Sequence, residues 1–405
     1  MPTGRIPGEP TLKMTIMRAD EERLYLDYAA NWPMRPEVWE AMGAELRHGY
    51  NPASAHAPGR MAHRCLELAR GRIGELLGCA RSCIYFTGGG TQSDNLAILG
   101  FVRAHEGSGP RVFVSQIEHK ACLEAADRGG LEGARVFRIP VDRSGTLDLE
   151  WLRGRLEADP AAPTLISVMW ANNEIGTVQA MDDIVALGHE HGALVHTDAV
   201  QAMGKVDVDL GRTPVDLLSA TAHKLGGPVG IGLLYRRPGV TLEPLSYGGG
   251  QERSMWPGTQ NPIGATGFAT ALALAVEERE AEVARWTALR DHLEGRLLAE
   301  IPDTRIHGGE APLRLPNLVS VGIPGCDSGA LLVSLDFEGI AASGGSACGS
   351  DSSVGSGVLD AIGVPGDAPY AAVRFSFGHE TTRADVDRAA DALARVAARV
   401  VALTA

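Results

Sequence analysis

The stretch "CIYFTGGGTQSDNLAILGFVRA", residues 83–104, contains a short apolar strand pattern, three consecutive glycines and a helical pattern. Strand, turn and helix in this order form the unit that parallel sheets repeat. Near-continuous apolar strands separated by helices predict an α/β fold, with a mostly parallel seven-stranded sheet covered by helices on both faces. Six further strand candidates continue the alternation, at 111–116, 135–140, 164–170, 193–200, 217–223 and 230–236.

The C-terminal third has a different pattern. Residues 267–301 predict one long helix or a kinked pair, apolar in the first half and amphipathic and charged in the second. Two strand candidates follow at 317–323 and 371–378, and a terminal helix is expected from "TRADVDRAADALARV", residues 382–396. These elements predict a second, smaller α+β domain.

The expected domain boundaries follow from these patterns. A large domain is predicted at 33–279, and the smaller domain is predicted to combine 23–32 with 280–405. Residues 1–22 lack the continuous apolar segment of a signal peptide and are expected to form a flexible tail.

Composition excludes several classes of protein. The 50 acidic and 37 basic residues give a net charge of −13, which argues against nucleic acid or an anionic membrane as the main partner. No apolar run reaches the roughly 18 residues needed to span a bilayer. The six cysteines lack the density and spacing of a disulfide framework, so reduced thiols and a cytoplasmic location are expected. The pair in "CARSC", 79–83, has no second pair or nearby histidine, and no metal site is predicted.

Three motifs carry residues suited to chemistry. "YFTGGGTQSDN", 85–95, predicts a phosphate cup in which Gly90, Thr91 and the first N–H groups of a helix face an anion. "VHTDAVQ" places Asp198 at the end of a strand, with Gln201 three residues later. "SATAHKLGG" places Lys224 between an apolar strand and a glycine-rich turn, where burial would lower the pKa of its amine.

A phosphate cup, a carboxylate for a pyridinium nitrogen and a buried lysine together suggest pyridoxal phosphate. Each feature alone has an ordinary structural explanation. The glycines could form a simple turn, Asp198 could cap one, and Lys224 could pair with a carboxylate. Their combination favours the cofactor.

The chain resembles the cysteine desulfurases, pyridoxal-phosphate enzymes of the class V aminotransferase superfamily with fold type I. The likeness runs from "LYLDYAA" at residue 24 to about residue 390. Its most specific pieces stand in the family's order: "NPASAHAPGR", "IEHKA", "ANNEIGTVQ", "HTDAVQ", "HK", "GGGQERSMWPGT", "SGGSAC" and "VRFSFG".

The resemblance implies a role for each matching residue. Lys224 would hold the cofactor covalently and remove the Cα proton of L-cysteine, and His119 would stack on the ring and shuttle protons. Asn173 and Arg374 would clamp the substrate carboxylate. The implied cofactor-binding residues are Gly90, Thr91, Asn173, Asp198, Gln201, Thr221, His223 and Lys224, with Thr259 from the second subunit of a homodimer.

Cys348 lies in "SGGSACGSD", residues 343–351, whose glycine and serine content predicts a mobile loop. By the resemblance, its thiolate takes sulfur from L-cysteine, releases alanine and carries the persulfide to an acceptor protein. The sequence departs from the family pattern at three places. Asn31 and Trp32 replace a threonine pair, Trp256 replaces a common arginine, and an acidic residue after the cysteine loop is absent. We expect these positions near the entrance or the acceptor surface.

Rival functions stay open at this point. An aminotransferase on the same fold is disfavoured by Cys348, whereas a selenocysteine lyase differs too little in chemistry for sequence to separate. A non-enzymatic homodimeric scaffold is disfavoured by the intact set of Lys224, Asp198, His119 and Cys348. The sulfur acceptor, whether in iron–sulfur assembly, tRNA thiolation or a dedicated biosynthetic route, is not determined by the sequence.

Overall fold

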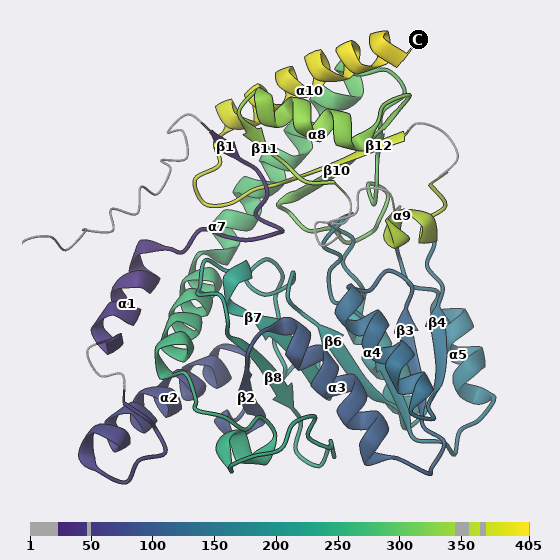
Figure 1. The fold of residues 1–405 in the computed structure, drawn as a ribbon. Coiled ribbons are helices and arrows are strands. Elements are labelled where there is room, and N and C mark those ends of the chain that lie inside the picture. Colours follow the sequence, from purple (N-terminus) through teal and green to yellow (C-terminus); the bar gives the residue numbers. More distant parts are fainter. Residues whose placement is uncertain (1–22, 47–49, 345–355, 365–369, 405) are drawn as a thin grey trace, which may run out of the picture.

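A computed structural model describes residues 23–46, 50–344, 356–364 and 370–404 (Figure 1). The predicted tail and Cys348 lie outside these residues. The main sheet has seven strands in the order β2-β8-β7-β6-β5-β3-β4, and only β8 runs antiparallel to its neighbours. The predicted, mostly parallel sheet is therefore confirmed. Its strands are β2 (Ile84–Thr87), β3 (Arg111–Ser115), β4 (Arg135–Ile139), β5 (Thr164–Ser167), β6 (Leu194–Asp198), β7 (Leu217–Thr221) and β8 (Gly232–Arg236).

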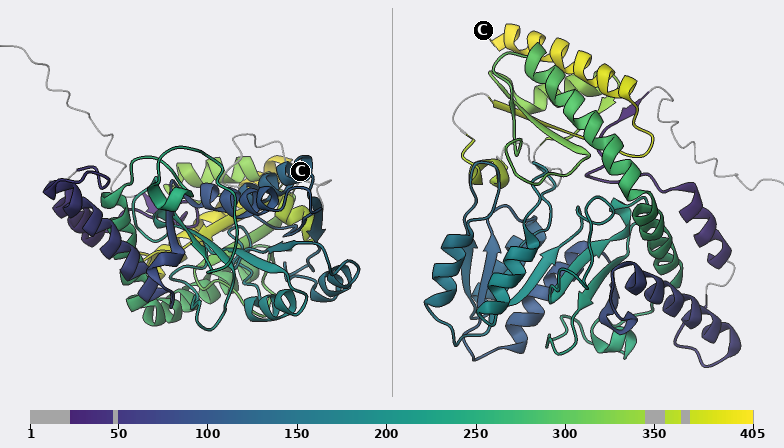
Figure 2. Two further views of the ribbon diagram at one scale, coloured as in Figure 1. Left: turned by 90° about the horizontal axis from the view of Figure 1, so that it is seen from below. Right: turned by 180° about the vertical axis from the view of Figure 1, so that it is seen from behind.

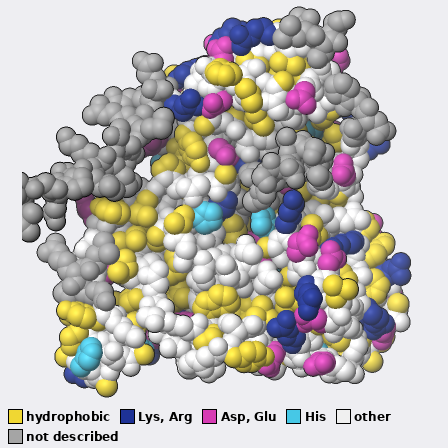
Figure 3. Space-filling view, in the orientation of Figure 1, with side chains coloured by type: hydrophobic (Ala, Val, Ile, Leu, Met, Phe, Trp, Pro, Cys, Tyr) yellow, Lys and Arg dark blue, Asp and Glu magenta, His cyan; other side chains and the backbone are white. Residues whose placement is uncertain are grey.

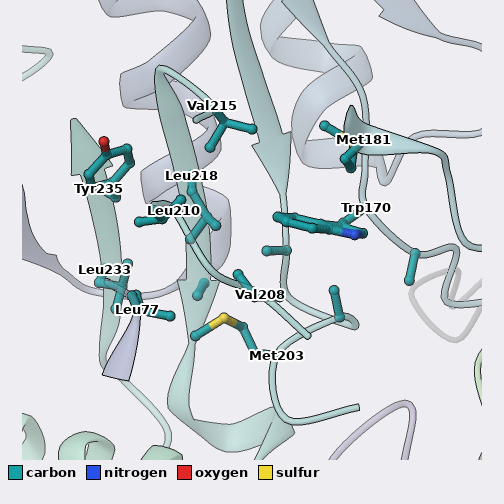
Figure 4. Packing of buried hydrophobic residues seen from close by; sticks show 14 of the residues in the cluster. Leu77, Trp170, Met181, Met203, Val208, Leu210, Val215, Leu218, Leu233 and Tyr235 are labelled. Atoms are coloured by element: carbon teal, nitrogen blue, oxygen red, sulfur yellow. The ribbon is translucent and has the colours of Figure 1, made fainter. Parts of the chain in front are cut away.

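Helices cover both faces of this sheet because successive strand residues point to opposite sides. Tyr85 packs in the cluster under α3 and α4, whereas the next residue, Phe86, packs in the cluster on the other face. Figure 4 shows part of that second cluster, where Trp170 and Met181 lie beside the sheet. The covering helices are α2 (Ala57–Leu76), α3 (Gly90–Ala104), α4 (Lys120–Leu131), α5 (Leu149–Glu157) and α6 (Met181–Glu190).

A smaller unit sits above the sheet in Figure 1 and has its own core. One continuous helix, α7 (Pro262–Glu300), runs from the side of the large sheet into this unit, as the right view of Figure 2 shows. The predicted domain boundary falls inside α7 and stays a prediction. The remaining elements are α1 (Pro36–Leu46), which packs against α7, and β1 (Leu24–Tyr25), β9 (Arg305–Ile306), β10 (Leu318–Pro324), α8 (Ser328–Phe337), β11 (Ile340–Ala341), α9 (Gly357–Ala361), β12 (Tyr370–Ser376) and α10 (Arg383–Thr404), with 3-10 turns at Arg81–Cys83, Ala222–Lys224 and Gln251–Ser254.

The N-terminal segment packs in the smaller unit, which is otherwise built from the C-terminal part of the chain. β1 pairs in parallel with β11, and Leu24, Leu26 and Tyr28 are buried in the same cluster as the second half of α7. This pairing carries residues 27–32 to the junction between the two units. In the described part of the chain, no helix combines the length and the apolar character needed to cross a bilayer.

Candidate active site

A cavity of about 310 Å³ opens at the carboxyl ends of strands β2, β3, β5, β6 and β7. Parallel sheets place their ligands at this edge. The structure brings together ten of the residues singled out in the sequence, although their roles stay predictions. The lining residues are Ala29, Ala30, Gly90, Thr91, Asp94, His119, Met169, Ala171, Asn173, Asp198, Val200, Gln201, Thr221, His223, Lys224 and Arg374.

The glycine turn after β2 brings bare backbone to the cavity. A Cβ on Gly90 would lie 2.9 Å from Cγ2 of Val200, so a larger residue would fit there only if Val200 shifted. The turn is fixed by Thr87, whose Oγ1 lies 2.8 Å from Oγ of Ser93 and donates to the carbonyl oxygen of Gly89. The first N–H groups of α3, with Thr91 beside them, face the cavity side of this turn and could hold a phosphate.

Asp198 ends β6 and is buried at the cavity, where its Oδ1 accepts a hydrogen bond from the N–H of Val200 at 2.8 Å. Burial raises the pKa of this carboxyl, and the nearby His119 and Lys224 lower it. A cationic ring nitrogen would be the missing counter-ion for this carboxylate.

Behind Asp198 lies a second buried carboxyl that the sequence analysis did not identify. A carboxylate oxygen of Asp94, the sulfur of Cys122 and a carboxylate oxygen of Asp198 lie within 4.8 Å of one another. Oδ1 of Asp94 has no hydrogen-bond partner among the residues that the structure describes. The pKa of Asp94 is raised well above its usual range, mainly by burial and secondly by the negative charge of Asp198. His196, 3.7 Å away, cannot supply a positive charge because burial lowers its pKa to about 3. Of the two carboxyls, Asp94 thus has the stronger tendency to hold a proton, and Asp198 is the better placed to carry negative charge.

Lys224 lies in the 3-10 turn that follows β7. Its Nζ donates to the carbonyl oxygens of Ala29 at 2.7 Å and Ala30 at 2.5 Å, in the segment after β1. The N–H group of Gln201 Nε2 donates to the same Ala29 oxygen at 2.9 Å. A second amine, Lys205, is buried behind the turn and reaches the carbonyl oxygen of Lys224 at 3.5 Å. The N-terminal segment thus fixes the position of the lysine amine.

Arg374 projects from β12 of the smaller unit and is almost completely buried. Its guanidinium donates to the carbonyl oxygen of Asn173 at 2.8 Å and to Oδ1 of Asp27 at 2.7 Å. Within the described part of the chain, the Nε–H group of Arg374 has no hydrogen-bond acceptor. A buried guanidinium N–H without an acceptor is costly, and a substrate carboxylate would satisfy it.

His119 caps the start of α4 and lines the cavity. Its Nδ1 accepts a hydrogen bond from the N–H of Ala121 at 3.1 Å, so the ring proton of the neutral form is on Nε2. The preceding Glu118 is buried and accepts from the N–H of Met169 at 2.6 Å. These two contacts hold the turn that brings His119 to the cavity.

Two predicted site residues are not placed in this cavity. Thr259 is exposed, between the 3-10 turn at Gln251–Ser254 and the start of α7, so a single chain does not bring it to the phosphate cradle. Cys348 lies outside the described residues. Trp32 is buried and packs edge-to-face on Trp286 in the smaller unit, and its expected place near the entrance or the acceptor surface stays a prediction. Asn31 contacts His223 directly.

These groups fit pyridoxal phosphate. The bare backbone around Gly90 leaves room for a phosphate beside Thr91 and Thr221. Asp198 is a buried carboxylate at the end of β6, and Lys224 is an amine held at the same cavity. The protein would hold the cofactor through these residues.

Comparison with known proteins gives the family. The family model described as aminotransferase class V matches residues 24–389, so the chain belongs to that family. An IscS-like cysteine desulfurase of Mycobacterium tuberculosis is 40% identical over 380 residues, covering 93% of this chain and 96% of the relative. Within the class V family, the chain thus belongs to the cysteine desulfurases, as its motifs predicted.

Solved structures agree with this assignment. A NifS-like protein matches with a TM-score of 0.86 at 33% identity and covers 93% of this chain and 100% of its own. SspA in complex with cysteine matches with a TM-score of 0.75 at 30% identity, over 87% of this chain and 98% of its own.

Proposed function

We propose that the protein is a cysteine desulfurase that uses pyridoxal 5′-phosphate to take sulfur from L-cysteine, giving L-alanine and a persulfide on Cys348. The observation that carries the proposal is the convergence of Lys224, Asp198 and Arg374 on one cavity. The three groups match the three needs of the chemistry: an amine for an aldehyde, a carboxylate for a ring nitrogen and a guanidinium for the substrate carboxylate.

When bound, pyridoxal phosphate supplies an aldehyde for the substrate amine and a ring that accepts an electron pair from Cα. Arg374 and Asn173 orient the substrate by its carboxylate. Lys224 then moves the proton at Cα, and His119, with its proton on Nε2, serves as a further proton donor. Asp198 keeps negative charge at the position of the ring nitrogen.

The thiolate of Cys348 attacks the substrate sulfur in this proposal. The bond between that sulfur and Cβ breaks, its electron pair stays on carbon, and Cys348 keeps the sulfur as a persulfide. Other thiols are less suited, because burial raises the pKa of Cys65 to about 11 and that of Cys79 to about 12. Burial also raises the pKa of Cys122 and Cys326, and a protonated thiol is a poor nucleophile.

A homodimer is part of the proposal. Thr259 is exposed away from the cavity of its own chain, which leaves it available to the cavity of a partner. Large apolar side chains are exposed on and beside α1 and α2, including Trp39 at 61% and Leu68 at 62% (Figure 3). Apolar area of this kind favours burial against another subunit.

The acceptor is proposed to be a protein that docks near Cys348, and the pathway is not assigned. A cytoplasmic location is proposed because Cys348 must remain a reduced thiol between turnovers. Selenocysteine lyase chemistry is the alternative on the same site, since selenium could replace the substrate sulfur without any change in the lining residues.

The test measures alanine release from L-cysteine by the purified holoenzyme, together with persulfide on the protein by mass spectrometry. Cys348→Ser should keep the bound cofactor and lose both products, whereas Cys65→Ser, the matched control thiol, should behave as the parent. Alanine release by Cys348→Ser at the parental rate would rule out the persulfide mechanism. Activity with selenocysteine alone would support the lyase instead.

A further inference from the structure

Asn31, one of the three departures from the family pattern, contacts the phosphate end of the candidate site. Its Oδ1 lies 2.9 Å from Nδ1 of His223, and its Nδ2 donates to the carbonyl oxygen of Trp32 at 3.1 Å. The backbone reinforces the contact, because the N–H of Trp32 donates to the carbonyl oxygen of His223 at 3.0 Å. Asn31 is therefore held against the turn that carries Lys224.

This geometry fixes which nitrogen of His223 carries the proton. A carbonyl oxygen only accepts hydrogen bonds, so the side chain of Asn31 must direct Nδ2 at Trp32 and Oδ1 at His223. Oδ1 is also only an acceptor, and Nδ1 of His223 must be the donor. In the neutral ring the other nitrogen, Nε2, then has a lone pair and no proton.

His223 lines the cavity beside Thr91 and Thr221, where the proposed function places the phosphate. A lone pair on Nε2 repels a phosphate oxygen, so the neutral ring in this tautomer cannot bind it. Only the imidazolium can donate to Asn31 and to the phosphate together. The ring is not an imidazolium beforehand, because burial and the charges of Lys224 and Lys205 lower the pKa of His223 to about 4.

Other charged groups near the ring do not change this conclusion. Lys224 belongs to the same turn as His223, and Lys205 lies behind it. Each of these amines, when it is charged, opposes a second proton on the ring. The remaining charged or titratable groups at the cavity are Asp94, Asp198, His119 and Arg374.

We propose that Asn31 is a positioning residue that makes capture of the cofactor phosphate by His223 depend on the uptake of a proton. The inference rests on the proposed function, because it takes the ligand to be a pyridoxal phosphate. The arriving dianion stabilises the imidazolium, so the protein binds one ligand and up to one proton together. Over the pH range in which the free ring is neutral and the bound ring is charged, affinity falls by up to about tenfold for each unit of rising pH.

The experiment titrates the folded apoprotein with 4′-deoxypyridoxine 5′-phosphate, which lacks the aldehyde and therefore excludes covalent chemistry at Lys224. Calorimetry in buffers of different ionisation enthalpy counts the protons taken up, at pH values from 7 to 8.5. That range lies above the second pKa of the phosphate, near 6. The proteins are the parent, Asn31→Thr, Asn31→Ala and His223→Gln.

Asn31→Thr is the informative variant, because a hydroxyl can donate to Nδ1 and leave the proton of a neutral ring on Nε2. On binding the probe, the parent should gain up to about one proton more than Asn31→Thr, Asn31→Ala or His223→Gln. Its affinity for the probe should also fall more steeply than theirs as the pH rises. Equal counts for the parent and the Asn31 variants would overturn the role of Asn31.

The remaining outcomes also decide the matter. Equal counts for the parent and His223→Gln would overturn the proton uptake itself, even if neither Asn31 variant folds. In that case, a larger proton uptake by the parent than by His223→Gln would support proton uptake by His223. No binding of the probe by the folded parent would overturn the proposed function, and the inference with it, whereas binding without excess uptake overturns the inference alone.

Discussion

Replacement of Lys205 by methionine should stabilise the protein below neutral pH. Lys205 is 3% exposed. Its Nζ donates one long hydrogen bond to the carbonyl oxygen of Lys224 and lies over the ring of Trp32, 5.7 Å from the ring centre. Among the described residues, no carboxylate forms an ion pair with it. Burial, and then the charge on Lys224, lower the pKa of Lys205 from 10.5 to about 7.

The size of the effect follows from that pKa. Below pH 7 the amine is charged in both the folded and the unfolded protein, and the folded state bears the whole cost of burying it, on the order of 4–5 kcal/mol. Between pH 7 and 10.5 the folded protein loses this proton first, so the cost shrinks by about 1.4 kcal/mol for each pH unit. Methionine has a similar length and no charge, and it should remove both the cost and this pH dependence.

The assay is urea unfolding of the apoprotein at several pH values from 6 to 9, followed by circular dichroism. Lys205→Met should unfold at higher urea than the parent at pH 6, and the gap should narrow as the pH rises. Lys120→Met, which changes an exposed lysine, should follow the parent curve. Parallel curves for the parent and Lys205→Met, or a less stable variant at pH 6, would refute the reasoning that the buried ammonium is destabilising.

Three further predictions test buried charges, the first away from the site and the other two within it. Glu252→Gln should lower the free energy of unfolding by up to roughly 3 kcal/mol in thermal or urea unfolding, because the buried Arg70 loses the charge of Glu252 and keeps only its ion pair with the more exposed Glu67. Breaking the exposed ion pair between Arg212 and Asp207 should leave the midpoint unchanged. Asp94→Asn should change the affinity of the apoprotein for pyridoxal phosphate less than about threefold, since the carboxyl already holds a proton, while Asp198→Asn should weaken it about 10–150-fold in a fluorescence titration. Arg374→Lys should raise KM for L-cysteine about 10–150-fold through the loss of charge-assisted hydrogen bonds, and an unchanged KM would contradict carboxylate binding there.

The fold could be predicted because its signals are local. Each strand of the large sheet is a short apolar run, and residues that line the cavity end these runs or come shortly after them, as Asp198 ends β6 and Lys224 follows β7. The carboxyl ends of parallel strands meet at one edge of the sheet. Sequence order alone therefore brings such residues together, and the motif series added Asn173 and Arg374.

The rest of the site could not be predicted because its contacts are made by main-chain atoms or by residues far apart in the chain. The amine of Lys224 is held by two backbone carbonyls that lie 194 and 195 positions away, and a carbonyl gives no signal in the residue type. Asp94 is one carboxylate among many until the fold buries it behind Asp198.

Asn31 is a second residue whose contacts could not be predicted from the sequence. In the sequence it was only a departure from a family pattern, expected near an entrance, and its partner His223 is 192 positions away. Its effect depends on two hydrogen bonds in series, because the contact with Trp32 orients the amide and the amide then fixes the ring proton of His223. A residue type can indicate that hydrogen bonds are possible, but only the arrangement of donors and acceptors in the fold determines which atom must donate.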